Sequence, residues 1–472
     1  MPTILYRFTR DLRLDDHAGL ASAAAEAEVL PVLVIDRGVE ARLARSPRRA
    51  AFYCAAVAAL DAALRERGTR LIVRRGNAGP VLKNVARASG ANGVMWSASY
   101  DGAGGHADSR LQSDLEEAGL RALIVHDAPA IPPEETADAR GAEGGGYRAF
   151  VPYFANWRER RPVTYELPLL LQFAASELQS EHLPIPAEFG AGDRTAHASP
   201  QIARDRLAQF LAHDALQYAV AMNVPSDDRT SQLAAHLALG TVSARTVVSA
   251  TLERIGDPFL LVEERASLKL FLRSLAQRDF FLQLGWFHPL TDDVSLQEKM
   301  RGFAFARKHP ALDAWRSGRT GYALVDAGIR QLHETGWMHP HVRAVAASFL
   351  CFDLGVDWRV GREEWDGYLI EDEPALATGN WQWIAGVGAD MAQYPRIYNP
   401  ERQRRRFDPT GTYVKMWVKE LAHVPAPSRR TVEEQIELPL FTTSEYPRPV
   451  VDHETEARKF LTRYRSYLAS VR

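Results

Sequence analysis

Half of the tryptophans are concentrated in one stretch of the chain, between residues 336 and 400. Five of the ten tryptophans lie there, together with a run of three acidic residues. An indole ring is easily oxidised and has a flat face, so such a cluster could relay electrons or stack against an aromatic ligand. Packing in a helical core is the alternative explanation. The residues concerned are Trp337, Trp358, Trp365, Trp381, Trp383, Glu371, Asp372 and Glu373.

The order of the motifs in this stretch is more informative than any single motif. The stretch reads GWMH, an arginine at 343, an apolar run of helical character, DWR, the acidic run, WQW and YPRIYNP. This series resembles the flavin domain of the photolyase/cryptochrome family. The resemblance covers roughly residues 3–425, and it implies a helical domain that binds FAD and responds to blue light.

The resemblance also implies a cofactor site assembled from several short segments. Thr230 and Ser231 precede a helical pattern, where a hydroxyl predicts an N-cap and the exposed backbone donors suit a pyrophosphate. Arg278 and Asp279 are neighbours, which ordinarily indicates an ion pair, but their place in the series assigns them to the same pocket. The FAD-binding residues expected are Tyr218, Thr230, Ser231, Gln232, Leu233, Arg278, Asp279, Glu371, Asp372 and Glu373.

An electron relay toward the flavin is the second implication of the resemblance. Trp381 matches the family's nearest electron donor and Trp358 matches the next one. The third, outer position is Phe305, and a phenyl ring is much harder to oxidise than an indole. The relay therefore ends at Trp358 or leaves by another route, for which Trp337, Trp365 or a tyrosine could serve.

Several residues match positions that face DNA in the family. Trp383 and Arg343 correspond to an aromatic wall and a basic rim for a flipped base. Four arginines, Arg402, Arg404, Arg405 and Arg406, could contact phosphates. A solvated loop is the alternative explanation for that basic run.

Other positions depart from the pattern of repair enzymes. Ser274 and Gln277 stand where enzymes for cyclobutane dimers have a Glu and a Trp. Pro340 replaces the Asn that follows GWMH, and Ala377 replaces the residue that faces the reactive flavin nitrogen. His339 and His341 have a spacing that metal ligands can use, but no third ligand is near in the sequence, so we expect no metal.

The first 130 residues alternate between short apolar runs and helical patterns, which predicts a doubly wound parallel α/β sheet of five strands. No G-x-G-x-x-G follows the first strand, which argues against a nicotinamide enzyme. The segment RFTRDLRLDDHAGL instead resembles the opening of the same family, whose first domain often holds a folate or deazaflavin antenna pigment. The expected strands are 4–8, 29–36, 71–73, 93–97 and 122–126.

Beyond residue 201 helical patterns dominate, which predicts an all-α domain. We expect helices over residues 48–67, 202–221, 232–239, 244–255 and 454–470. The predicted organisation is an α/β antenna-type domain at 1–130, a connection at 131–200, a helical FAD-binding domain at 201–430 and a tail at 431–472.

Composition limits the class of protein. The net charge is −2, so any nucleic-acid binding requires a local basic surface. The two cysteines, Cys54 and Cys351, fit a reducing, cytoplasmic setting and exclude a four-cysteine iron–sulfur cluster. We see no secretion signal and no apolar run long enough to span a bilayer.

Two functions remain in competition. The first is a light-driven DNA photolyase, a carbon–carbon lyase that repairs pyrimidine photoproducts in UV-damaged DNA, and we expect a monomer. The second is a cryptochrome-like blue-light photoreceptor that has lost repair and signals through flavin photoreduction. The substitutions in the lesion pocket favour the second, and the absence of a long tail after the helical domain favours the first.

Overall fold

The computed structural model describes residues 2–137, 145–166, 172–174, 178–390, 395–423 and 446–471. The chain forms two compact units, each built from several segments. Unit 1 comprises Met1–Tyr218, Ser231–Asp292 and Ile370–Leu376. Unit 2 comprises Ala219–Thr230, Asp293–Leu369 and Ala377–Arg472.

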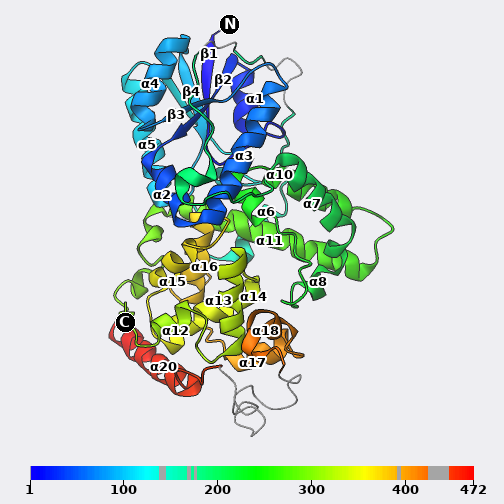
Figure 1. Ribbon diagram of the computed structural model, residues 1–472, viewed down its shortest axis with the longest axis vertical. Helices are drawn as coiled ribbons and strands as arrows, with labels where there is room; N and C mark the ends of the chain where they lie inside the picture. The colour runs from blue at the N-terminus through cyan, green and yellow to red at the C-terminus, as the bar shows by residue number, and fades with distance from the viewer. Residues whose placement is uncertain are drawn as a thin grey trace. The chain divides into compact units, whose positions relative to one another are not determined.

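Unit 1 contains a five-stranded parallel sheet with the strand order β3-β2-β1-β4-β5 (Figure 1). The order reverses direction after β1, as in other doubly wound folds. The predicted α/β fold class is therefore confirmed. The strands are β1 (Thr3–Phe8), β2 (Glu28–Ile35), β3 (Ile72–Arg75), β4 (Gly93–Ser97) and β5 (Arg121–Val125).

Helices cover both faces of this sheet (Figure 1). Alternate side chains of a strand point to opposite faces, so Tyr6 packs in one core with α1 (Ala18–Ala24) and α3 (Pro47–Arg65). Leu5 packs in a second core with α4 (Ala78–Ser89) and α5 (Gly102–Glu117). The near-continuous apolar character of the strands follows from burial on both sides.

Some of the remaining helices of unit 1 lie beyond residue 201, where we expected a separate helical domain. Leu12 N donates to Leu239 O at 3.0 Å, so the loop after β1 is bonded to a residue far along the chain. Segments beyond residue 201 thus belong to unit 1 together with the sheet. The helices are α2 (Arg37–Arg45), α6 (Phe150–Trp157), α7 (Pro200–Ala212), α9 (Ala234–Leu239), α10 (Ala244–Ile255) and α11 (Val262–Phe287).

One predicted helix is interrupted. The apolar pattern over 202–221 predicted a single helix, but α7 ends at Ala212 and His213 has φ −129° and ψ −72°, outside the helical region. A 3-10 turn, Asp214–Gln217, and the short helix α8 (Tyr218–Ala221) follow. The prediction of one continuous helix was wrong because a pattern of apolar spacing does not register a single residue with non-helical dihedral angles.

A buried carboxylate, Asp127, holds the segments of unit 1 together. Asp127 lies just after β5 and accepts from Arg13 at 2.7 Å and from Arg245 at 2.8 Å. It also accepts from the backbone of Ala18 at 3.0 Å. Burial by itself would raise the pKa of Asp127, but the guanidinium groups of Arg13 and Arg245 hold it below its usual range. The carboxylate is therefore charged and links three distant parts of the sequence.

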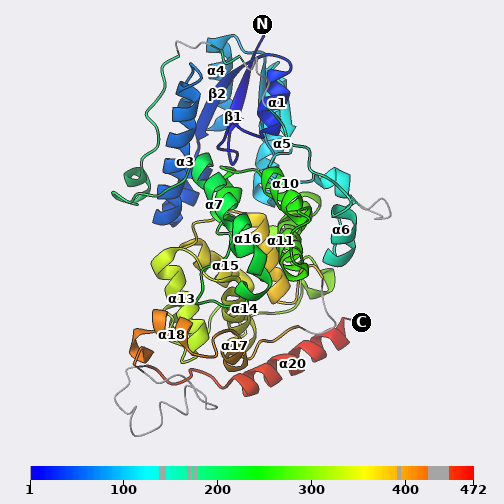
Figure 2. The same ribbon diagram turned by 90° about the vertical axis from the view of Figure 1, so that its right-hand side faces the viewer.

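Unit 2 is helical, as the sequence predicted beyond residue 201. A π-helical turn, Phe349–Asp353, continues α14, and α20 packs against that turn (Figure 2). No helix in the described part of the chain is both long and apolar enough to cross a membrane. The helices are α12 (Leu312–Arg316), α13 (Ala323–Thr335), α14 (Pro340–Ser348), α15 (Trp358–Asp366), α17 (Pro400–Phe407), α18 (Thr412–Trp417) and α20 (His453–Ser470).

Two further points concern the ends of these elements. Helix α16 (Pro374–Ile384) begins in unit 1 and continues in unit 2. The helix predicted over 454–470 is observed as α20, whereas residues 431–445 of the expected tail lie outside the described residues.

Replacing Asp127 by asparagine should strongly destabilise unit 1. The substitution leaves Arg13 and Arg245 buried without their shared countercharge, and breaking a buried ion pair in this way costs about 3–5 kcal/mol. Urea unfolding followed by circular dichroism should show a lower midpoint with an unchanged slope.

Asp15→Asn is the matched control. Asp15 pairs with Arg204 at 2.6 Å, but its side chain is 61% exposed, so the loss should stay below about 1 kcal/mol. Equal effects of the two substitutions would show that the Asp127 network does not hold the unit together.

Candidate functional site

Three buried tryptophans at the centre of unit 2 lie on two helices. Trp358 and Trp365 lie on α15, and Trp381 lies on α16; they are 0%, 5% and 4% exposed. The rings of Trp365 and Trp381 have centroids 4.5 Å apart. Gly361 lies between the two α15 tryptophans, and a Cβ there would collide with the Trp381 ring. The glycine therefore lets the indole of Trp381 lie directly on the α15 backbone.

The surroundings of Trp358 differ from those of Trp365. The guanidinium groups of Arg359 and Arg362 lie 4.5 Å and 5.3 Å from the Trp358 ring centroid. Trp365 instead stacks on Trp315 of α12, with centroids 6.0 Å apart and planes 16° apart. The two tryptophans of α15 thus lie on one helix but in different electrostatic settings.

Phe305, the expected outer relay position, belongs to an aromatic cluster with α20. Its ring lies 4.9 Å from Phe303 and 6.1 Å from Phe460, measured between centroids. Trp337, another route considered from the sequence, makes a ring contact with His339 at 6.1 Å. Of the alternatives considered, Trp365 is the residue whose ring contacts Trp381.

The segment 230–233 does not cap a helix in the way that we predicted. Helix α9 begins at Ala234, its N-cap is Leu233, and no side chain caps it. The N-cap prediction for Thr230 and Ser231 was therefore wrong, because the chain turns at Gln232, which has φ +49°, before the helix begins. The hydroxyl of Thr230 is left buried and has no hydrogen-bond partner among the described residues.

Tyr218 packs on α11 within unit 1. Its ring makes an edge contact with Phe271 at 5.6 Å, and its hydroxyl lies 3.4 Å from the hydroxyl of Ser274. Gln277, one turn further along α11, is exposed. Two of the residues that depart from the repair pattern therefore lie on one helix, and one of them is bonded to an expected cofactor residue.

Arg278 and Glu373 form a two-pronged ion pair inside unit 1. Arg278 donates from Nε at 3.0 Å and from Nη2 at 2.6 Å to the two carboxylate oxygens of Glu373. Arg278 also donates to the carbonyl of Ala128 at 2.8 Å. The pair therefore fixes residue 373 to the end of the sheet, and its rigid geometry suits a binding site.

Asp279 has a structural set of partners. Its Oδ2 accepts from the backbone of Ala130 at 2.9 Å and of Ile131 at 3.2 Å, and from the indole of Trp157 at 3.0 Å. Burial raises the pKa of this carboxyl to about 6, against the opposing effect of Arg278. As it lies, Asp279 anchors the connection after β5 and α6 rather than offering Oδ2 to a ligand.

Asp372, the middle member of the acidic run, faces the arginines of unit 1. Its Oδ2 lies 3.4 Å from Arg10 and 3.2 Å from Arg42. Burial would raise its pKa, but Arg10, Arg42 and Arg49 together lower it. Glu371 is half-buried. The three acidic neighbours therefore have different settings.

The residues expected to face DNA have unequal access to solvent. Trp383 is partly exposed, and the guanidinium of Arg396 lies 5.7 Å from its ring centroid. Arg343 on α14 is half-buried and donates from Nε to the carbonyl of Met338 at 2.7 Å. An aromatic face with one nearby cation, Arg396, is thus retained in unit 2.

The basic run on α17 divides into one buried and three exposed arginines. Arg404 is 2% exposed and donates to Glu401 at 2.7 Å. The expected phosphate contact is therefore corrected for Arg404, because its guanidinium lies inside the unit. Arg405 is exposed, with an ion pair to Glu401 at 3.2 Å, and Arg402 and Arg406 are also exposed.

His339 is buried beside the half-buried His341, with ring centroids 5.7 Å apart. Burial, with the nearby His341 and Arg343, lowers the pKa of His339 to about 3. The ring of His341 stacks on Phe407 with centroids 4.5 Å apart. No cluster of three or more potential metal ligands occurs in the part of the chain that the structure describes.

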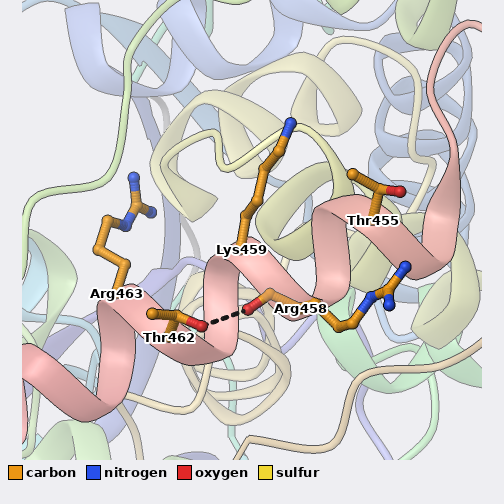
Figure 3. Close-up of a pocket in the computed structure, with 5 residues that line it drawn as sticks. All are labelled: Thr455, Arg458, Lys459, Thr462 and Arg463. Carbon is orange, nitrogen blue, oxygen red and sulfur yellow. Dashed lines mark hydrogen bonds between the residues drawn. The ribbon is translucent and has the colours of Figure 1, made fainter.

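A basic face on α20 was not singled out from the sequence. A surface recess of about 530 Å³ is lined by three cations and two hydroxyls and no carboxylate. Figure 3 shows the five lining side chains on this helix. The signal was present as Lys459 and Arg463, four residues apart on one helix, which places these two on one face, with Arg458 next to Lys459 in the sequence. The lining residues are Thr455, Arg458, Lys459, Thr462 and Arg463.

Comparison with known protein families covers most of the chain. Residues 4–169 match the family described as DNA photolyase. Residues 271–466 match the FAD binding domain of DNA photolyase. A deoxyribodipyrimidine photo-lyase of Halobacterium salinarum is 34% identical over 95% of this chain and 96% of that protein.

Solved structures agree with this result. A class III photolyase of Agrobacterium tumefaciens superimposes with a TM-score of 0.84 at 28% identity, covering 99% of this chain and 98% of that chain. A cryptochrome of Synechocystis has a TM-score of 0.84 at 25% identity, covering 98% of this chain and 99% of that chain. The similarity therefore extends through both units.

Replacing His339 by asparagine should reduce the loss of folding stability at low pH. The pKa of His339 is about 3, against an ordinary value of 6.5, so the unfolded chain binds this proton first as the pH falls. Stability is therefore lost between pH 6.5 and 3, by at most about 1.4 kcal/mol per pH unit. His339→Asn should remove this part of the slope, measured as the free energy of urea unfolding at several pH values.

His339→Ala provides the comparison. His339 caps α14 by accepting from the backbone of His341 at 3.3 Å, and asparagine can replace that cap whereas alanine cannot. Both variants should have the same reduced slope, with the alanine variant less stable by about 1 kcal/mol at every pH. An unchanged slope in both would contradict the assignment.

Proposed function

We propose that this chain, which belongs to the photolyase/cryptochrome family, is a blue-light-driven FAD flavoprotein that repairs pyrimidine photoproducts in UV-damaged DNA. As a carbon–carbon lyase it would split the bonds that join two damaged bases. The observation that carries the proposal is the buried contact between Trp365 and Trp381 in the FAD-binding domain, at 4.5 Å. An oxidised flavin that lies next to this pair of indoles would be able to take an electron from them.

The residues present suit FAD. The hydroxyl of Thr230 is buried and has no partner among the described residues, so it is available to donate to a phosphate oxygen. Ser231 and the unblocked amides at the start of α9 supply further donors. Tyr218, Gln232 and Leu233 complete this phosphate side of the proposed site.

The proposed FAD ligands also include an acidic run. Glu371, Asp372 and Glu373 would hold ribose hydroxyls and the edge of the flavin ring. Arg278 keeps Glu373 in a fixed position through the two-pronged pair. Asp279 contributes by anchoring the chain around that pair.

When bound, FAD would supply the light-driven one-electron redox chemistry. The protein's own contribution is to position the cofactor and the lesion and to exclude water from them. Trp381 is 4% exposed and Trp358 is 0% exposed, so an electron that passes through either indole moves in a dry interior. Ala377 presents only a methyl group, which can neither donate nor accept a hydrogen bond.

DNA binding is assigned to unit 2. Enzymes that act on a base, photolyases among them, take it out of the stack and hold it against aromatic walls. Trp383 with Arg396 over its face provides such a wall. Arg343 and the exposed Arg405 would contact the flanking phosphates.

Three finer points belong to the same proposal. A second chromophore, a folate or a deazaflavin, would sit in the α/β domain as an antenna. The protein would act in the cytoplasm, where the buried thiols of Cys54 and Cys351 stay reduced. We expect it to be a monomer.

A cryptochrome-like photoreceptor is the second candidate, and specific residues favour it. Ser274 is bonded to Tyr218 rather than presenting a carboxylate, and Gln277 offers no indole to a lesion. Pro340 begins α14 where repair enzymes have an asparagine. A protein with this site would still photoreduce FAD but would not split a dimer.

Light-dependent repair of defined oligonucleotides tests the proposal. The purified protein should be yellow with bound FAD. After reduction it should restore an oligonucleotide that carries either a cyclobutane dimer or a six-four photoproduct, in blue light and not in the dark. Chromatography of the oligonucleotide measures the product, and Trp383→Ala should lower the yield at least tenfold by removing the aromatic wall.

If FAD is bound and photoreduced but neither lesion is repaired, the photoreceptor is the correct function. If the protein holds no FAD, both candidates are wrong.

DNA affinity should depend steeply on salt, because bound phosphates release counterions. Arg405→Ala should weaken binding of lesion-containing duplex and lower the slope of log affinity against log salt by about 1. Fluorescence anisotropy over a range of salt concentrations measures both quantities.

Arg458→Ala is the matched control, because Arg458 is an exposed cation on the α20 face of Figure 3. It should leave the slope unchanged. A loss with Arg458→Ala but not with Arg405→Ala would move the DNA-binding surface to α20.

A further inference from the structure

We propose that the electron relay of this protein runs from Trp381 to the stacked pair Trp365 and Trp315, and not outward through Trp358. The inference rests on the proposed function, since it concerns how the flavin is supplied with electrons. It assigns Trp365 and Trp315 as redox residues, whereas the sequence series pointed to Trp358 and the position of Phe305.

The first support is ring contact. Trp381 and Trp365 have centroids 4.5 Å apart, and Trp365 and Trp315 have centroids 6.0 Å apart with nearly parallel planes. The three indoles form a continuous series from α16 through α15 to α12. All three are at most 5% exposed, so little solvent reorganisation would oppose transfer between them.

The second support is charge. Oxidation of an indole leaves a positive charge on the ring. At Trp358 that charge would form beneath Arg359 and Arg362, at 4.5 Å and 5.3 Å from the ring centroid. Two cations at this distance repel a third, and burial strengthens the repulsion. Trp358 is therefore the harder of the two α15 tryptophans to oxidise.

The carboxylate partners of these arginines offset the repulsion only in part. Arg359 pairs with Asp357 at 3.0 Å, and the partner of Arg362, Asp293, lies 3.6 Å away with an 84% exposed side chain. The cations lie over the ring, whereas Asp293 is largely in water, where its field is screened. Beside Trp365 and Trp315, Arg316 and Glu364 form a neutral pair at 2.9 Å.

The third support is the end of the other route. Beyond Trp358 the usual outer position is Phe305, whose neighbours are Phe303 and Phe460. Arg463 lies 5.1 Å from the Phe303 centroid and 5.4 Å from that of Phe460. Phenyl rings under a cation do not accept a positive charge, so a charge on Trp358 has no outlet there.

Electron transfer between the indoles makes and breaks no bond. Oxidised Trp381 takes one electron from Trp365, and Trp365 takes one from Trp315. The indole protons stay in place: Trp315 Nε1 donates to the carbonyl of Ala346 at 3.0 Å, and a carbonyl does not remove a proton. The positive charge is therefore shared by the stacked pair until an external thiol returns one electron and releases its proton to water. Two such thiyl radicals then join as a disulfide, so two thiols supply two electrons.

Matched phenylalanine variants of the FAD-loaded protein test the relay. Trp365→Phe should slow blue-light reduction of the flavin by an external thiol at least tenfold, whereas Trp358→Phe should change it less than twofold. Transient absorption should show an indole cation signal that Trp365→Phe removes and Trp358→Phe retains. A loss with Trp358→Phe equal to or greater than that with Trp365→Phe overturns the proposal.

Circular dichroism provides a readout that needs no bound cofactor. Stacked indoles couple their electronic transitions, so Trp365→Phe and Trp315→Phe should each remove the same component of the tryptophan spectrum, and Trp358→Phe should not. Thermal unfolding identifies any variant that fails to fold. Trp381→Phe distinguishes failure of this route from failure of the proposed function. If the flavin of the Trp381→Phe variant is still photoreduced normally, no relay through Trp381 exists, whatever the effect of Trp365→Phe.

Discussion

Unit 1 depends on one buried charge, the carboxylate of Asp127, shared between Arg13 and Arg245. A buried carboxylate is unfavourable unless it is paired and fully hydrogen-bonded. Here the pairing joins the loop after β1, the end of β5 and α10, so the fold satisfies the charge only when all three are in place. Asp11 is held similarly, accepting from Tyr6 at 2.6 Å and Ser97 at 2.5 Å. The RDLR segment that marks the family therefore has a structural role, because its side chains bond the loop after β1 to other parts of unit 1.

The tryptophan site of unit 2 depends on a glycine and on the placement of arginines. Gly361 removes the side chain that would hold Trp381 away from α15, which lets Trp381 reach Trp365. Arg359 and Arg362 over Trp358 then make the two α15 tryptophans unequal. One residue sets the distance between the rings, and the two cations set the direction in which a positive charge can move.

The residues of the acidic run match a single sequence motif but have different partners in the structure. Glu373 is fixed by Arg278, and Asp372 is paired with Arg10 and Arg42. The extra methylene of each flanking glutamate gives a longer reach than the family's aspartates have. The carboxylates that the sequence grouped together are therefore held by separate sets of arginines, and each set limits which oxygen can turn toward a ligand.

The sequence by itself determined the sheet, its parallel order and the family, because apolar periodicity and a long ordered series of motifs are properties of the chain alone. It placed β4 at 93–97 and α10 at 244–255 as observed. It could not show that Arg404 is buried, that Thr230 does not cap α9, or that the ring of Trp365 contacts that of Trp381. Those facts depend on which side chains meet after folding. Contact and burial between residues distant in sequence arise only from tertiary packing.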